Sequence, residues 1–209
     1  MTVKKAIEGI GFDVDQPISA SEADAFLKAG NIFCIRYIPR TPALIKGNLT
    51  GLELQMLLTA GLAVMVVQHV AEPGWQPSGA LGTQYGQYAA AYAKAIGYQA
   101  GANVWLDLEE VADAATPEQV IEYCKAWYDA VLSTGYVPGL YCGYGTKLTP
   151  QQLYDLPFTH YWNAYNGPGV ATRGCQLLQR TEQVLNGIKY DPNHLQKDNL
   201  NDLPIWVTN

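Results

Sequence analysis

A unit of three parts recurs along this chain: a helix that begins after a hydroxyl residue, a glycine that ends it, and an apolar strand that follows at once. A serine or threonine before a helix, with an acid or amide three residues later, satisfies free amide hydrogens of the first turn. Glycine ends a helix because it adopts a left-handed backbone without strain. The predicted N-caps are Ser21, Thr50, Thr116 and Thr149, and the closing glycines are Gly30, Gly61 and Gly135. The unit predicts a chain that alternates helices and strands.

Eight segments are almost continuously apolar, which is typical of strands in a parallel sheet covered by helices. They span residues 8–14, 32–38, 62–69, 103–109, 137–143, 159–164, 175–180 and 185–190. Eight strands that alternate with helices favour closure into a (β/α)8 barrel over an open, doubly wound sheet. Because 209 residues shared by eight units leave about 26 per unit, we predict one small α/β barrel of the TIM type over residues 1–209. Its helices should be degenerate after residue 157.

The composition argues against several classes of function. Apolar residues make up 48% of the chain and charged residues 15%, which is typical of a compact globule rather than a disordered chain. The net charge is −6 and no basic run occurs, so neither nucleic acid nor an anionic membrane is an expected partner. The longest apolar runs, such as residues 62–67, are too short to span a membrane. Nothing in the sequence indicates an oligomeric state.

The start of the chain, MTVKKAIEGIGFDVD, contains no apolar stretch long enough for a secretory signal. We therefore expect the protein to be cytoplasmic when it is made. Its cysteines are Cys34, Cys124, Cys142 and Cys175, and no two of them form a Cys-x-x-Cys pair. This spacing favours buried thiols over a zinc site or a redox motif, and we expect no cofactor.

Acidic residues stand at the ends of three predicted apolar strands, where they are costly to bury. The acids are Asp13, Asp107, Glu109 and Asp191. Residues two apart in a strand share a face, so Asp107 and Glu109 should project together into the barrel mouth, with Leu106 and Leu108 facing the helices. Because the first and eighth strands of a closed barrel are neighbours, Asp13 and Asp191 should adjoin at the same mouth. Glu110 should point away into a loop.

Carboxyl groups that converge repel one another, which raises the pKa of at least one and keeps it protonated near neutral pH. Glycoside hydrolysis uses such a division, because one carboxylic acid protonates the leaving oxygen while a carboxylate stabilises the cationic transition state. The alternative interpretation is structural: these acids cap loops or bind Lys and Arg. In the segment 71–80, Trp75 is expected to be exposed, either to stack on a sugar ring or to pack against the protein.

Six short motifs in barrel order resemble those of the glycoside hydrolase family 25 lysozymes, and more closely those of their glycoside-hydrolase-like relatives. They are GFDVD, WLDLEE, GLYCGYG, HYWNAYN, CQLLQRT and IKYDPNHL. The resemblance implies that Glu109 is the general acid and that Asp107 orients a reacting N-acetyl group of the substrate, supported by Asp13 and Asp191. It also implies that Tyr141, Trp162 and Gln179 line the floor of the site, although each fits the ordinary core as well.

Three functions remain open at this stage. The first is a glycosidase that cleaves peptidoglycan, which must reach the wall through phage lysis or a dedicated secretion system. The second is an inactive barrel that binds polysaccharide, and the third is a metal-dependent hydrolase that holds Mg²⁺ or Ca²⁺ at the acidic mouth. We expect no metal, because no histidine accompanies the acids. His69 stands at the end of a predicted strand, where it either lines the barrel mouth or forms structural hydrogen bonds. His160 and His194 are not spaced from other residues as a functional pair would be.

Overall fold

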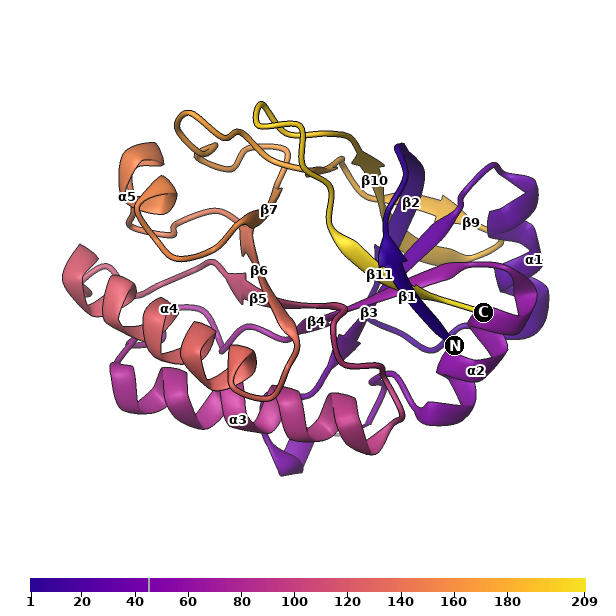
Figure 1. The fold of residues 1–209 in the computed structure, drawn as a ribbon, viewed down its shortest axis with the longest axis horizontal. Coiled ribbons are helices and arrows are strands. Elements are labelled where there is room, and N and C mark those ends of the chain that lie inside the picture. Colours follow the sequence, from indigo (N-terminus) through magenta and orange to yellow (C-terminus); the bar gives the residue numbers. More distant parts are fainter. Residues whose placement is uncertain (45) are drawn as a thin grey trace.

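Eight strands close into a barrel in the computed structural model, which describes residues 1–44 and 46–209 (Figure 1). The order around the barrel is β4, β3, β2, β10, β8, β7, β6 and β5, which pairs again with β4. The strands are β2 (Gly9–Val14), β3 (Phe33–Ile38), β4 (Ala63–Gln68), β5 (Asn103–Leu108), β6 (Val137–Cys142), β7 (His160–Asn163), β8 (Leu177–Gln179) and β10 (Ile188–Leu195). All neighbours are parallel except at β10, which is antiparallel to both β2 and β8. The predicted small barrel is confirmed.

The helices are unevenly distributed around the barrel. They are α1 (Ala20–Lys28), α2 (Gly51–Ala60), α3 (Gly79–Ala95), α4 (Pro117–Leu132) and the short α5 (Pro150–Tyr154), with a 3₁₀ turn at Pro42–Leu44. No further helix follows α5 in the described part of the chain, as expected for degenerate C-terminal units. Figure 1 shows α3 and α4 side by side beneath the strands. Glycine allows this close approach, because a Cβ on Gly82 would lie 2.3 Å from the carbonyl oxygen of Tyr123. None of the described helices is long and apolar enough to cross a membrane.

Three of the four predicted N-caps are confirmed. The side chains of Thr50, Thr116 and Thr149 each accept a hydrogen bond from the amide three residues later. The prediction for Ser21 is wrong, because Ser19 caps α1 and exchanges hydrogen bonds with Glu22 in a complete capping box. The closing glycines Gly30, Gly61 and Gly135 have φ values of +91°, +109° and +87°. These values lie in the left-handed region that a glycine after a helix adopts.

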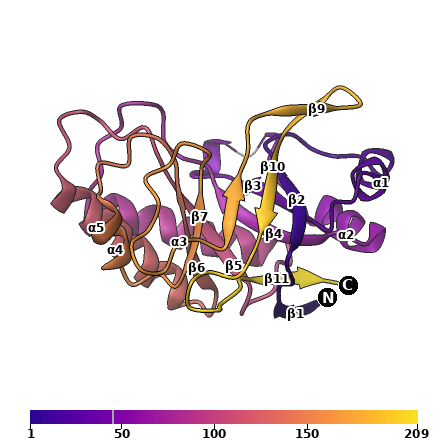
Figure 2. The same cartoon turned by 90° about the horizontal axis from the view of Figure 1, so that it is seen from above.

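The predicted eighth strand, residues 185–190, is wrong in position and direction. It contains the turn of a hairpin between β9 (Gln183–Leu185) and β10. Asn186 and Gly187 occupy that turn with φ values of +51° and +84°. These two residue types tolerate positive φ, which two-residue hairpin turns require, so the chain reverses and β10 reaches β2 from the opposite direction. Figure 2 shows the hairpin extending beyond the other strands.

Two terminal strands, β1 (Thr2–Lys5) and β11 (Ile205–Thr208), were not predicted. They pair with each other antiparallel, and β11 also pairs with β4 through Val207 and Val64. The two ends of the chain therefore lie side by side (Figures 1 and 2).

Two apolar cores flank the barrel wall. Trp105, Phe33, Met65, Trp162 and Trp206 belong to the inner core, while Val104, Leu106 and Leu108 belong to the core between the barrel and the helices. On β5, odd-numbered residues therefore face inward. This alternation directs Asp107 into the barrel.

Candidate active site

Four acids meet at the end of the barrel where the parallel strands finish. Asp13, Asp107, Glu109 and Asp191 line one cavity of about 360 Å³. Asp107 lies on the inward face of β5 and is only 4% exposed, and Glu109 follows two residues later. Asp191 is paired directly with Asp13 between β10 and β2. The acids converge although β10 runs opposite to the predicted direction, because an antiparallel strand brings its N-terminal half to this end of the barrel.

Glu110 departs from this group. Its φ is +52°, and its amide donates a hydrogen bond to the carbonyl oxygen of Tyr144. The loop thus turns sharply after Glu109. A Cβ on Gly143 would lie 2.2 Å from Oε2 of Glu109, so glycine at this position leaves room for the Glu109 carboxyl group.

Asp13 is held by three donors. Its Oδ1 accepts hydrogen bonds from Nδ2 of Asn193 at 2.6 Å and from Nε2 of Gln179 at 3.0 Å, and its Oδ2 accepts one from the Tyr37 hydroxyl at 3.3 Å. These bonds favour the charged carboxylate, but burial and the negative charge of Asp191 outweigh them and raise the pKa of Asp13 to about 7.

The other three acids also hold their protons more tightly than in water. Burial, followed by the charge of Glu109, raises the pKa of Asp107 well above its ordinary value. Its Oδ1 has no hydrogen-bond partner in the protein. Burial and the charges of Glu110 and Asp191 raise the pKa of Glu109 to about 7. Burial and the charges of Glu182 and Asp15 raise the pKa of Asp191 to about 6. The site can therefore hold both protonated and ionised carboxyl groups near neutral pH.

Tyr141 and Gln179 support the acids from within the barrel. The Tyr141 hydroxyl donates a hydrogen bond of 2.7 Å to Oε1 of Gln179, which leaves Nε2 of Gln179 to donate to Asp13 and, at 3.4 Å, to Asp191. Trp162 lies below them: it is 1% exposed, and its ring centre is 4.5 Å from that of Tyr141. Its ring is part of the inner core.

The expectation of an exposed Trp75 ring is wrong. Trp75 is 9% exposed and its ring packs edge-on against Tyr123 with the ring centres 4.8 Å apart. Its indole nitrogen donates a hydrogen bond of 2.9 Å to the backbone oxygen of Glu109. Trp75 therefore fixes the loop that carries Glu109. The surrounding Pro73, Gly74, Pro77 and Gly79 are typical of an exposed loop, but the hydrogen bond of the indole and the contact with Tyr123 of α4 bury the ring.

Several residues of the cavity were missed in the sequence. The missed residues that line it or bind its acids include Asp15, Gln16, Tyr37, Glu182, Lys189 and Asn193. Tyr37 had a usable signal, because it follows the inward Ile35 by two residues on β3. Asn193 did not, since the strand that carries it was predicted to end at residue 190. His69 lines the cavity with its ring 4.5 Å from that of Tyr37, and burial lowers its pKa.

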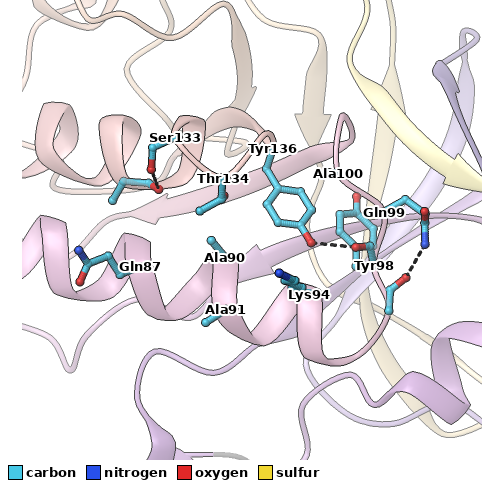
Figure 3. Close-up of a pocket in the computed structure, with 12 residues that line it drawn as sticks. Gln87, Ala90, Ala91, Lys94, Tyr98, Gln99, Ala100, Ser133, Thr134 and Tyr136 are labelled. Carbon is cyan, nitrogen blue, oxygen red and sulfur yellow. Dashed lines mark hydrogen bonds between the residues drawn. The ribbon is translucent and has the colours of Figure 1, made fainter.

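Other candidates for a functional site would be a metal-binding group or a second cavity among the described residues. Within residues 1–44 and 46–209, no three His, Cys, Asp or Glu side chains are grouped to hold a metal ion. A larger cavity of about 710 Å³ lies between the ends of α3 and α4 (Figure 3). Of the described residues that line it, only Lys94 is charged, and the Tyr136 hydroxyl is bonded to the backbone oxygen of Tyr98. The acidic cavity is smaller but holds the reactive groups.

The sequence profile of the Rv2525c-like, glycoside hydrolase-like domain matches residues 24–195. The chain belongs to this family. The predicted resemblance is thus confirmed. The matched residues include Asp107, Glu109 and Asp191 and every barrel strand except β2, which carries Asp13. No curated protein is significantly similar to the chain.

Solved structures share the fold at low sequence identity. The Tat-secreted protein Rv2525c of Mycobacterium tuberculosis, in complex with L-tartrate, is 17% identical with a TM-score of 0.69, over 90% of this chain and 96% of that one. The spore cortex lytic enzyme SleM of Clostridium perfringens is 15% identical with a TM-score of 0.68, over 96% and 71%. The catalytic domain of the endolysin ply40, from a phage of Listeria monocytogenes, is 18% identical with a TM-score of 0.65, over 92% and 95%. This Rv2525c-like chain therefore shares its fold with a spore cortex lytic enzyme and with the catalytic domain of an endolysin.

Proposed function

We propose that this protein is a glycosidase that cleaves bacterial cell-wall peptidoglycan, with residues 1–209 acting as one catalytic domain. The proposal is carried by one observation: Glu109, whose pKa is raised to about 7, lies in a cavity with Asp107, a buried carboxyl group that has an unpartnered oxygen. An acid that keeps its proton at neutral pH, beside a carboxyl group with one oxygen free to accept a hydrogen bond, suits the hydrolysis of N-acetylated sugars.

In the proposed reaction Glu109 donates its proton to the glycosidic oxygen as the bond from that oxygen to the anomeric carbon breaks. The N-acetyl oxygen of the same sugar attacks the anomeric carbon and forms a cyclic intermediate, so no protein nucleophile is needed. Asp107 accepts the N-acetyl N–H on its free oxygen and stabilises the positive charge that develops there. Water then opens the intermediate, giving one proton to the Glu109 carboxylate and its oxygen to the anomeric carbon.

The supporting roles follow from the hydrogen bonds around the pair. Asp13 and Asp191 are proposed to bind sugar hydroxyls, with Gln179 and Tyr141 fixing the orientation of Asp13. The relatives SleM and ply40 are named as lytic enzymes, which favours a wall polysaccharide as the substrate class. Such a substrate requires export or release at lysis, and the Mycobacterium relative is Tat-secreted.

Clearing of purified peptidoglycan tests the proposal. The wild type should reduce the turbidity of a wall suspension, and Glu109→Gln should slow clearing by about 100-fold or more, because it removes the general acid at nearly constant volume. Glu8→Gln, at an exposed position away from the cavity, should clear at the wild-type rate. If neither the wild type nor Glu109→Gln clears the walls but both sediment with them, the protein is a binding barrel instead. Loss of clearing on chelation would favour a metal-dependent hydrolase.

A further inference from the structure

The β9–β10 hairpin has one face toward the acidic cavity and one toward the core. Val184 is paired directly with Lys189, and Gln183 with Tyr190. Partners across an antiparallel pair share a face, and so do residues two apart. One face therefore carries Glu182, Val184, Lys189 and Asp191, and the other carries Gln183, Leu185, Ile188 and Tyr190. This arrangement puts Lys189 on the same face as the site acid Asp191.

The core-facing side anchors the hairpin. The Tyr190 ring packs edge-on against the rings of Phe26 and Phe12, with ring centres 4.9 Å and 6.0 Å away. Leu185 and Ile188 pack into the core between the barrel and the helices. Phe12 directly precedes Asp13 on β2. The hairpin is therefore attached to the strand that carries one of the site acids. Glu182, Lys189 and Asp191 of its other face line the cavity.

The cavity is lined by many more acidic than basic side chains. Its lining includes six carboxyl groups, those of Asp13, Asp15, Asp107, Glu109, Glu182 and Asp191. Among the described lining residues, Lys189 carries the only permanent positive charge. A polymer that carries carboxylates would be repelled by this cavity unless a cation met them first.

Lys189 is placed to do so. Its ammonium group lies 3.0 Å from Oε1 of Glu182, and its side chain is 71% exposed. An ion pair this exposed contributes little, so exchange of Glu182 for a carboxylate of a ligand has a small cost. Val184 beside it is 62% exposed and offers an apolar contact to the same ligand.

We propose that Lys189 binds a carboxylate of the substrate, so that the hairpin selects glycans with carboxyl-bearing substituents over uncharged glycans. Peptidoglycan carries such groups in the lactyl and peptide substituents of its sugars. The inference rests on the proposed function for the substrate class, and it adds a specificity-determining residue outside the catalytic pair.

Binding of soluble peptidoglycan fragments tests this assignment, compared with the same fragments after their carboxyl groups have been converted to amides. Titration calorimetry in a Glu109→Gln background keeps both ligands intact. That background should bind the native fragments about fivefold more tightly than the amidated ones, and 0.5 M salt should reduce the preference. Adding Lys189→Met, which keeps the length of the side chain, should bring the preference to one or below, because the acids of the cavity then repel the native fragments. Adding Lys28→Met instead, which breaks an exposed ion pair on α1, should keep it at about fivefold.

The outcomes separate this inference from the proposed function. A preference that persists in the Lys189→Met variant overturns the role of Lys189, even where the wild type clears walls. A preference that disappears with Lys189→Met supports that role, even where the wild type clears nothing. Failure to bind either ligand overturns both proposals.

Discussion

Asp107 is deeply buried but poorly bonded for a carboxyl group. Its Oδ1 has no protein partner, and its pKa is well above the ordinary value because of burial and the charge of Glu109. In the unfolded chain the same group ionises at its ordinary, lower pKa, so the unfolded state releases a proton that the folded state keeps. The folded state is therefore penalised as the pH rises above that ordinary value. Asp107 therefore contributes less to the stability of the folded state at neutral pH, where we expect it to take part in catalysis, than at acidic pH.

Replacing Asp107 by Asn should therefore stabilise the protein at neutral pH, by roughly 1–3 kcal/mol at pH 8, since an amide of the same shape carries no charge to bury. Below pH 4 the advantage should disappear, because the carboxyl group is then protonated in both states. Urea unfolding of wild type and variant at pH 3 and pH 8 measures the difference. Asp113→Asn is the matched control: Lys147 lowers the pKa of exposed Asp113, so this change should be slightly destabilising at pH 8. An Asp107→Asn protein that is less stable than the wild type at pH 8 would contradict the argument.

The inward orientation of Asp107 and Glu109 follows from alternation along one strand, so the sequence could predict it. Alternation depends only on local backbone geometry. The donors to Asp13 could not be predicted in the same way, because Asn193 and Gln179 come to it from strands distant in sequence. Their positions depend on which strands are neighbours and in which direction each runs.

At the scale of elements, the buried ion pair between Arg36 and Glu53 joins β3 to α2. Nε of Arg36 donates to Oε1 of Glu53 at 2.8 Å, and its other nitrogens donate to the backbone oxygens of Val14 and Gly47. Oε1 of Glu53 also accepts the amide of Ile18. These bonds fix the connection between β2 and α1, which contributes Asp15 and Gln16 to the cavity. The pair holds one wall of the site in place.

Glu53→Gln should lower the free energy of unfolding by about 3 kcal/mol, because it leaves a buried guanidinium without its counter-charge. The double variant Arg36→Met/Glu53→Leu should lose less than this single variant, since it removes both charges and keeps apolar volume in place. Chemical denaturation followed by circular dichroism measures both changes. Asp24→Asn, which breaks the exposed pair with Lys28, should have no measurable effect. A double variant that is less stable than Glu53→Gln would show that the backbone bonds of Arg36 matter more than the charges.

Helix boundaries and the seven parallel strands could be predicted because capping hydroxyls, closing glycines and apolar runs are local signals. The hairpin at Asn186 and Gly187 had a local signal as well, an Asn-Gly pair, but the expected eightfold repeat favoured one further parallel strand. The N-cap of α1 is Ser19 and not the predicted Ser21. Both are serines near the start of the helix, but only Ser19 has a glutamate three residues later. The repeated helix–strand unit therefore predicts the barrel as a whole, but it does not predict the hairpin that replaces the last parallel strand.

At the scale of the whole molecule, the two ends of the barrel differ in the residues that line them. The mouth holds acids, while the floor is sealed by the two terminal strands and by Trp206. Trp206 is 3% exposed, and its ring centre lies 5.9 Å from that of Phe33 in the inner core. Next to it, the amide of Ile205 donates a 2.7 Å hydrogen bond to Oδ1 of Asn103 at the start of β5. The same strand, β5, thus receives the C-terminus at one end and carries the site at the other.

Trp206→Ala should lower the free energy of unfolding by about 3–5 kcal/mol, the cost of removing a large buried ring from a core that cannot collapse around the space. Trp206→Phe should recover part of this loss, because it refills much of the volume. Ile7→Ala, at a residue 63% exposed that follows the neighbouring strand β1, should change the stability little. Urea unfolding followed by circular dichroism measures all three. Since Trp206 and the acids lie at opposite ends of the barrel, binding of peptidoglycan fragments by the folded Trp206→Ala protein at low temperature should match that of the wild type. A variant that keeps its stability would show that the terminal strands cover the barrel floor without sealing it.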